Sequence, residues 1–149
     1  MPIVYKKGSL FLAPKGSILV HACNAKGIWG SGIAKEFKKL FPLSYEYYQR
    51  ECLIRKVGEI IIPPFENGYG IVCLVTSDGY GRFKDSPTII LENTYKALKE
   101  FLRIPPVQQI HSCKFNSGLF GIEWEKTESV LNLVIAETVY FGNWTIWEL

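Results

Sequence analysis

The 149-residue sequence has no hydrophobic run long enough to cross a membrane, and its first residues lack the order of a secretory signal. It also lacks low-complexity tracts and any CxxC pair, and three of its four cysteines lie in apolar, strand-like runs. Such cysteines are typical of buried, reduced thiols. These absences predict an ordinary globular protein of the cytoplasm, with the nucleus as a second compartment.

A large surplus of either charge is also missing, since the net charge at pH 7 is only +3. Lys35, Lys38 and Lys39 recur at helical spacing with Glu36 among them. That pattern is typical of a solvated helix face and does not indicate a nucleic-acid partner. With 48% hydrophobic residues, the chain is long enough for one substantial core and too short for two ordinary domains. We expect a single domain over residues 1–149 that is a monomer.

Short runs with strand character alternate with segments in which apolar residues recur at helical spacing. The expected strands cover residues 3–5, 18–21, 59–62, 69–76, 109–115 and 144–149, and the expected helices cover residues 33–41, 44–54, 87–102 and 125–134. The apolar run at 71–75 is continuous enough to predict a central strand that is buried on both faces. The alternation favours an α/β fold: a three-layer α/β/α sandwich around a mixed, mostly parallel sheet, with ligands beyond the carboxyl ends of its strands.

A glycine-rich loop follows the second expected strand and opens a helix. Its glycines, Gly27, Gly30 and Gly32, let backbone N–H groups approach an oxyanion at a helix start. Gly27 and Gly32 have the spacing of a Walker loop, but Ile33 stands where that loop has its lysine. The GxGxxG fingerprint also fails, because Lys35 occupies its last position. The loop predicts a phosphate cradle, with a plain tight turn as the alternative.

A second loop of this kind covers residues 115–124, again between an expected strand and an expected helix. Two such loops at neighbouring strand ends can grip a diphosphate from both sides. The alternative is that Asn116-Ser117-Gly118 forms a plain turn and that Phe120 and Trp124 belong to the core. That alternative leaves the first loop without a partner, so we favour a paired site.

The two loops, with the opening Tyr5-x-Lys7-Gly8, resemble the macro domain family over nearly the whole chain. The resemblance rests on His21-x-Cys23-Asn24 with the glycines of the first loop, and on residues 116–121 with Trp124. Within that family it is strongest to fungal phosphatases of ADP-ribose 1″-phosphate. The resemblance implies a macro domain fold and a small-molecule ligand, ADP-ribose or a derivative, with no cofactor and no membrane partner.

The resemblance also implies roles for individual residues. Asn24 would contact the distal ribose, residues 30–34 and 117–121 would wrap the phosphates, and residues 8–10 would lie beside the adenine. The full implied set of ligand-binding residues is Gly8, Ser9, Leu10, Ala22, Cys23, Asn24, Trp29, Gly30, Ser31, Gly32, Ile33, Ala34, Asn116, Ser117, Gly118, Leu119, Phe120, Gly121 and Ile122.

The sequence departs from the family pattern at two places. Many macro domains have an aspartate that reads the adenine amino group where this chain has Ser9, so the resemblance implies weaker or backbone-led adenine recognition. Related hydrolases that remove ADP-ribose from protein or DNA have a lysine in the loop after the central strand, where this chain has Ser77-Asp78. Lys84 lies in the same loop and is a possible substitute, which keeps the hydrolase interpretation open.

His21 ends its expected strand and points toward the same loop as Asn24. It is therefore the candidate for general acid/base catalysis near neutral pH, with a structural histidine as the alternative. His111 lies earlier in its strand and Asp78 precedes a glycine, so we expect structural roles for both. Cys23 is not followed by the arginine-bearing loop of a cysteine phosphatase, and no metal-ligand spacing is present. The hypothesis is a metal-independent phosphoric monoester hydrolase that converts ADP-ribose 1″-phosphate to ADP-ribose. An ADP-ribosyl hydrolase and a non-catalytic ADP-ribose reader are the alternatives.

Overall fold

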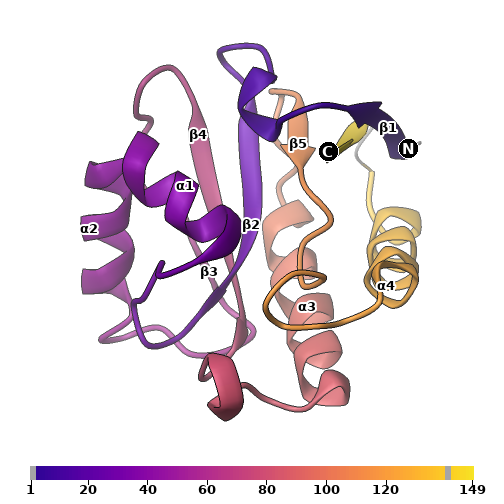
Figure 1. The fold of residues 1–149 in the computed structure, drawn as a ribbon. Helices are drawn as coiled ribbons and strands as arrows, with labels where there is room; N and C mark the ends of the chain where they lie inside the picture. The colour runs from indigo at the N-terminus through magenta and orange to yellow at the C-terminus, as the bar shows by residue number, and fades with distance from the viewer. Residues whose placement is uncertain (1–2, 140–141) are drawn as a thin grey trace.

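The computed structural model describes residues 3–139 and 142–149. Within them the chain forms a six-stranded sheet covered by helices (Figure 1). The strands are β1 (Ile3–Lys7), β2 (Ile18–Asn24), β3 (Ile60–Ile61), β4 (Gly70–Ser77), β5 (Ile110–Ser112) and β6 (Trp144–Glu148). The helices are α1 (Gly32–Leu40), α2 (Pro42–Glu51), α3 (Pro87–Leu102) and α4 (Trp124–Ala136), with short 3-10 helices η1 (Leu10–Leu12) and η2 (Gly81–Phe83).

The strand order is β1-β6-β5-β2-β4-β3, and every neighbouring pair is parallel except β3 with β4. One apolar cluster joins the sheet to α3 and α4, with Leu98 and Leu131 among its members. A second cluster joins the opposite face to α1 and α2, with Phe37 and Tyr48 among its members. The expected three-layer sandwich with a mixed, mostly parallel sheet is confirmed.

The apolar run in β4 was expected to mark a central strand, and this is only half right. All eight residues of β4 are buried, as a strand covered on both faces requires. The strand nevertheless lies second from the edge, because only the two-residue, antiparallel β3 pairs with its outer side. β5 and β2 occupy the middle. Continuous hydrophobicity reports burial of both faces and carries no information about position in the sheet.

Local signals explain several helix boundaries. Pro42 was expected to end the first helix, and it also opens α2 at the first helical position, so only Phe41 separates the two helices. Ser86 caps α3, because its hydroxyl oxygen accepts a hydrogen bond from the backbone amide of Ile89 and Pro87 follows it. The strand expected at 109–115 is shorter than predicted, since β5 ends at Ser112. No helix in the described part of the chain is both long and apolar enough to span a bilayer.

Candidate functional site

Parallel strands deliver their following loops to one edge of the sheet. Figure 1 shows the loops after β2 and β4 in the lower half of the view, with α1 and the loop after β5 drawn in front. We call residues 25–31 the first loop and residues 113–123 the second loop. The backbone amide of Ala25 donates to the carbonyl oxygen of Ser77 at 3.0 Å, which ties the first loop to the end of β4.

Asn24 ends β2 and holds the first loop in shape. Its Oδ1 accepts a hydrogen bond from the backbone amide of Lys26 at 2.9 Å, and its Nδ2 donates to the carbonyl oxygen of Ile28 at 2.8 Å. The Tyr48 hydroxyl of α2 donates to the backbone carbonyl of Asn24. A side chain with both a donor and an acceptor is needed here, which explains the asparagine. Nothing in the sequence spacing pointed to Tyr48, since it lies 24 residues away on another element.

The Trp29 side chain lies in the core beneath the first loop. It is 1% exposed, and its indole stacks on the Tyr48 ring with centroids 5.0 Å apart. Trp29 was expected to contact the ligand, but its buried ring supports the loop from the core side. Its Nε1 atom is buried and has no hydrogen-bond partner among the described residues.

The start of α1 is open to an anion. Its N-cap residue Ser31 makes no side-chain capping bond, and no acidic residue lies in the first turn. Within residues 3–139 and 142–149, the backbone amides of Trp29, Gly30 and Ser31 also have no acceptor. Gly32 has a φ of +61°, a conformation that glycine adopts without strain. Unpaired amides at a helix start favour negative charge, as the sequence predicted for a phosphate cradle.

The second loop is built on Asn116, which is buried and has a φ of +68°. Its Oδ1 accepts a hydrogen bond from Thr76 Oγ1 at 3.0 Å, and its Nδ2 donates to Thr94 Oγ1 at 2.9 Å. Its carbonyl oxygen accepts from the backbone amide of Ile122 at 2.9 Å, which closes the loop. Asn116 therefore serves the loop from beneath and joins it to β4 and α3.

The tip of the second loop leaves donors free. In the part of the chain that the structure describes, the backbone amides of residues 118–120 have no acceptor. The Ser117 hydroxyl is buried and also lacks a partner. Phe120 and Ile122 anchor the loop, because both are buried against Ile90 of α3. The alternative expected for Phe120, a place in the core, is therefore correct for its side chain, while its backbone amide has no acceptor among the described residues.

The two loops meet. A methyl group on Gly32 would lie 3.7 Å from Leu119 Cδ1, so the start of α1 and the tip of the second loop are within van der Waals reach. Leu119 is nevertheless 62% exposed. Two sets of unpaired backbone amides thus flank one point at the carboxyl edge of the sheet. An arrangement of this kind suits a ligand with several phosphate oxygens.

His21 does not lie where the sequence placed it. The strand does not end at His21 but continues to Asn24, and the His21 side chain is 0% exposed. Its ring lies 4.0 Å from the Phe37 ring, centroid to centroid, and 4.8 Å from Trp29. The expectation that His21 ends its strand and faces the loop is wrong, because alternation along β2 turns it toward α1.

Cys23 and Cys73 surround His21 within the same core. Their Sγ atoms lie 3.5 and 3.8 Å from His21 Nε2. The three ligand atoms lie within 4.8 Å of one another, which is close enough for them to share a metal ion. The sequence did not reveal this set, because Cys73 comes from β4 and is distant in the chain. Burial raises the pKa of the Cys23 thiol well above its usual value, so the neutral thiol is not a nucleophile.

Residues 8–10 follow β1 and lead into η1. The Gly8 amide donates to the Glu148 carbonyl at 2.7 Å, and the Ser9 hydroxyl caps η1 through the amide of Phe11. Leu10 is buried in the core. The Phe11 ring contacts the Phe37 ring with centroids 5.1 Å apart, which places this segment beside α1.

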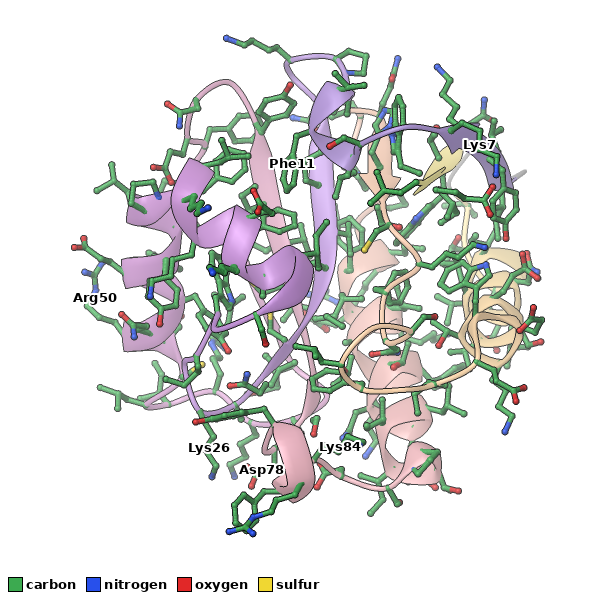
Figure 2. All side chains as sticks on the ribbon, viewed as in Figure 1. Lys7, Phe11, Lys26, Arg50, Asp78 and Lys84 are labelled. Carbon is green, nitrogen blue, oxygen red and sulfur yellow. The ribbon has the colours of Figure 1, made fainter. Side chains whose placement is uncertain are left out.

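The loop after β4 carries exposed charge at the same edge of the molecule. Figure 2 shows Lys26, Asp78 and Lys84 near η2, and Lys26 forms an ion pair with Asp78 at 3.3 Å. The Asp85 carboxylate accepts a hydrogen bond from the Asp78 amide at 2.8 Å and fixes the turn. Lys84 is exposed. Asp78 therefore has the solvated turn position that its sequence context predicted.

His111 has the structural role that was expected. It is buried in β5, and its Nδ1 accepts a hydrogen bond from Trp147 Nε1 at 2.9 Å. Burial, and secondarily the positive charge of Lys6, lower the pKa of His111. The neutral form is the one that can accept from the indole, so the histidine and the tryptophan hold β5 and β6 together.

Comparison with known proteins agrees with this geometry. The macro domain family matches residues 20–131. A protein of Aspergillus clavatus named ADP-ribose 1″-phosphate phosphatase is 32% identical over 87% of this chain and 88% of its own length. A Candida albicans protein of the same name is 36% identical over 87% and 91%. The macrodomain of Mycobacterium tuberculosis DarG superposes with a TM-score of 0.81 at 21% identity, covering 99% of this chain and 98% of that one. The chain belongs to the macro domain family.

Proposed function

We propose that the chain binds ADP-ribose derivatives between the first and second loops and removes the terminal phosphate of ADP-ribose 1″-phosphate. The observation that carries the proposal is the convergence of two sets of unpaired backbone amides, at 29–31 and 118–120, where the start of α1 approaches Leu119 so closely that a methyl group on Gly32 would lie 3.7 Å from it. The names of the fungal relatives support the choice of substrate. In this interpretation the amides hold the phosphate oxygens, and Asn24 and Asn116 keep the loops in place.

The reaction breaks the bond between phosphorus and the oxygen on C1″ and forms a bond from phosphorus to a water oxygen. The products are ADP-ribose and inorganic phosphate. Negative charge that develops on the phosphoryl oxygens is stabilised by preorganised backbone donors, whose orientation is fixed before the substrate arrives. The open start of α1 adds its helix dipole. Since these donors supply the electrostatic stabilisation, the proposal requires no metal ion.

His21 enters the proposal as a positioning residue. Its ring packs against Phe37 of α1 and Trp29 of the first loop, so it connects β2 to both parts of the phosphate cradle. It has no exposed surface from which to exchange a proton with a ligand. The general acid/base role inferred from the sequence requires access that the side chain does not have in this conformation.

Phosphate release from ADP-ribose 1″-phosphate by the purified chain tests the activity. We expect stoichiometric ADP-ribose and phosphate, and no release from a protein with Gly32→Val, which blocks the start of α1. Assays with ADP-ribosylated protein and ADP-ribosylated DNA run in parallel. They test the alternative of an ADP-ribosyl hydrolase, for which exposed Lys84 in the loop after β4 is the candidate residue. Turnover of only those substrates would replace the phosphatase by a hydrolase, and tight ADP-ribose binding without any turnover would make the protein a reader.

A further inference from the structure

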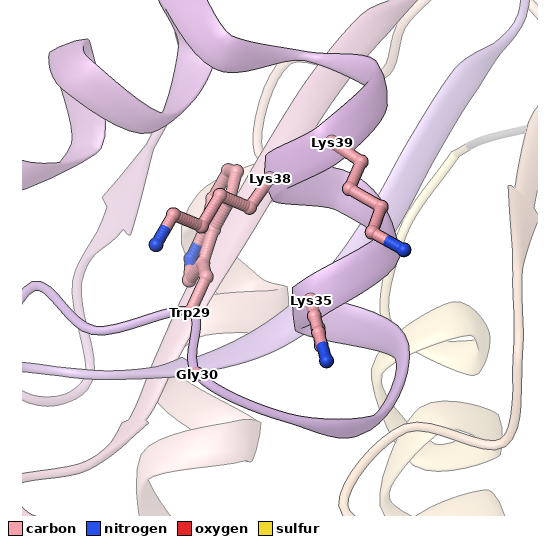
Figure 3. Close-up of a pocket in the computed structure, with 5 residues that line it drawn as sticks. All are labelled: Trp29, Gly30, Lys35, Lys38 and Lys39. Carbon is pink, nitrogen blue, oxygen red and sulfur yellow. The ribbon is translucent and has the colours of Figure 1, made fainter.

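A cavity of about 350 Å³ lies between the first loop and α1, away from the second loop (Figure 3). Its lining consists of Trp29 and Gly30 from that loop and Lys35, Lys38 and Lys39 from α1. No residue of the second loop lines it. Lys38 Nζ lies 5.0 Å from the centre of the Tyr45 ring, which places the cavity on the side of α1 that faces α2.

The polar groups that line this cavity are donors. Three lysines contribute to the lining, and in Figure 3 the Lys38 side chain extends on the Trp29 side of α1 while those of Lys35 and Lys39 extend on the other side. The ion pairs of the described residues involve other lysines. Their charge is therefore not neutralised by a nearby carboxylate within the described structure. Lys35 and Lys39 lie four positions apart in α1, a spacing at which like charges destabilise a helix. Lys35 also lies near the positive end of the helix dipole, which is unfavourable for a cation.

The buried donor of Trp29 gives the cavity a second, independent feature. The indole Nε1 atom has no hydrogen-bond partner among the described residues, although the side chain is 1% exposed. A buried donor without a partner loses free energy relative to a solvated one, so native proteins rarely leave one unsatisfied. The Trp29 ring and the Lys38 ammonium group both lie against Tyr45, with the Trp29 ring centroid 5.1 Å and Lys38 Nζ 5.0 Å from the centroid of the Tyr45 ring. The exposed lysine side chain is flexible, and an acceptor that displaces it can reach both donors.

From these features we propose that the cavity binds a phosphate-type oxyanion, held by Trp29 Nε1 and the Lys38 ammonium group. An oxyanion accepts several hydrogen bonds at once and neutralises the lysines, which a neutral ligand does not. Gly30 is the link to the ligand site, because its amide has no acceptor in the described structure and its loop leads into α1. An oxyanion bound in this cavity would hold the first loop in one conformation.

The anion can be free phosphate or the phosphate monoester of a small metabolite. Both present the same oxygens to the Trp29 and Lys38 donors, and the volume of the cavity accommodates a group larger than phosphate. The site does not depend on the proposed phosphatase reaction, since the binding groups belong to the resting protein. If the reaction is also correct, its phosphate product is one source of the ligand.

Two-dimensional ¹H–¹⁵N NMR of the full chain tests the site directly. The chain has four tryptophans, each with one indole N–H, so Trp29 Nε1–H serves as an internal probe once its signal is assigned by its loss in Trp29→Phe. Titration with inorganic phosphate, with glycerol 2-phosphate in a second arm, is expected to shift the Trp29 indole and Gly30 amide signals saturably. Sodium chloride at matched ionic strength is expected to leave them in place. A shift with inorganic phosphate alone would restrict the site to the free anion.

Lys38→Gln is the decisive variant. Its matched control is Lys126→Gln, which changes an exposed lysine on α4. Loss of one charge-assisted hydrogen bond is expected to weaken phosphate binding about tenfold in Lys38→Gln, and binding by Lys126→Gln is expected to equal that of the wild type. A Trp29 signal that does not move, or equal affinities for all three proteins, would overturn the proposal. ADP-ribose added alone is expected to shift the amides of residues 118–120, so failure at the cavity is distinguishable from failure of the proposed function.

Discussion

The imidazole ring of His21 stacks on the phenyl ring of Phe37, with ring centroids 4.0 Å apart and an interplanar angle of 10°. This contact joins the middle of β2 to α1, whose first turn follows the unpaired backbone amides of residues 29–31. The ring makes this contact from a position with no exposed surface. A histidine used in this way acts through packing, and its influence on ligands passes through the helix.

The first prediction concerns the chemistry of His21. His21→Phe keeps an aromatic ring against Phe37 and Trp29, and we expect it to fold and to retain most of the kcat for phosphate release. His21→Ala leaves a cavity and is expected to lower the free energy of unfolding by about 3 kcal/mol and to raise KM. Steady-state kinetics and urea unfolding measure both effects. A well-folded His21→Phe that has lost kcat and one limb of its pH profile would show that the imidazole itself transfers the proton.

Gly32 provides a test of the close approach between the start of α1 and the second loop. Gly32→Ala places a methyl group toward Leu119 and forces an L-residue to a φ of +61°, which costs about 1–2 kcal/mol. We expect ADP-ribose affinity, measured by calorimetry, to fall about tenfold when that strain opposes the bound conformation. Gly16→Ala is the matched control, since Gly16 has a φ of +93° and open space around it. Equal affinity losses in both variants would mean that global destabilisation is responsible.

Asn116 is expected to be essential for stability. Asn116→Ala removes its hydrogen bonds to Thr76 and Thr94 and leaves both hydroxyls without these partners in the core. We expect the free energy of unfolding to fall by about 2–4 kcal/mol, as judged by urea denaturation. Asn67→Ala is the comparison, because Asn67 also has a positive φ and one side-chain hydrogen bond but is exposed. A loss no larger than that of Asn67→Ala would contradict the role of Asn116 as the support of the second loop.

His111 predicts a pH dependence of stability. Its pKa in the folded protein is lower than the ordinary value of 6.5, so below pH 6.5 the unfolded chain binds more protons at this residue. Its contribution to stability is complete above pH 6.5 and is lost as the pH falls toward the folded value. His111→Gln keeps an acceptor for Trp147 that does not titrate. Unfolding free energies between pH 7.5 and 5 are expected to fall more steeply for the wild type than for this variant, and parallel curves would contradict the prediction.

Metal removal tests whether catalysis needs an ion that the buried cluster of His21, Cys23 and Cys73 could hold. Because the proposed charge stabilisation comes from backbone amides, we expect phosphate release to persist after dialysis against EDTA. Elemental analysis of the protein before and after dialysis shows whether the treatment removed any ion. Activity that disappears with a stoichiometric metal and returns when that metal is added would refute the metal-independent mechanism.

Local chemistry carries most of what the sequence revealed. Ser86-Pro87 identified the start of α3, and Pro42 marked the boundary between two helices, because capping and the missing proline amide act within one turn of the chain. The glycines of the first loop and Asn116-Ser117-Gly118 located both loops for the same reason. Gly27, Gly32 and Asn116 have positive φ angles, which favour glycine and asparagine, so these residue types mark the loops in the sequence.

Only the tertiary structure decided which side chains face a ligand. His21 and Trp29 were read as site residues, yet both lie in the core, because the alternation of β2 and the packing of α1 determine direction. Tyr48 beneath Asn24, Thr94 beneath Asn116 and Cys73 beside His21 were not foreseen. The sequence by itself determined that two loops rich in glycine and asparagine follow β2 and β5, since a turn is a local property. Which donors they leave free depends on contacts between strands and helices far apart in the chain, and those form only when the sheet assembles.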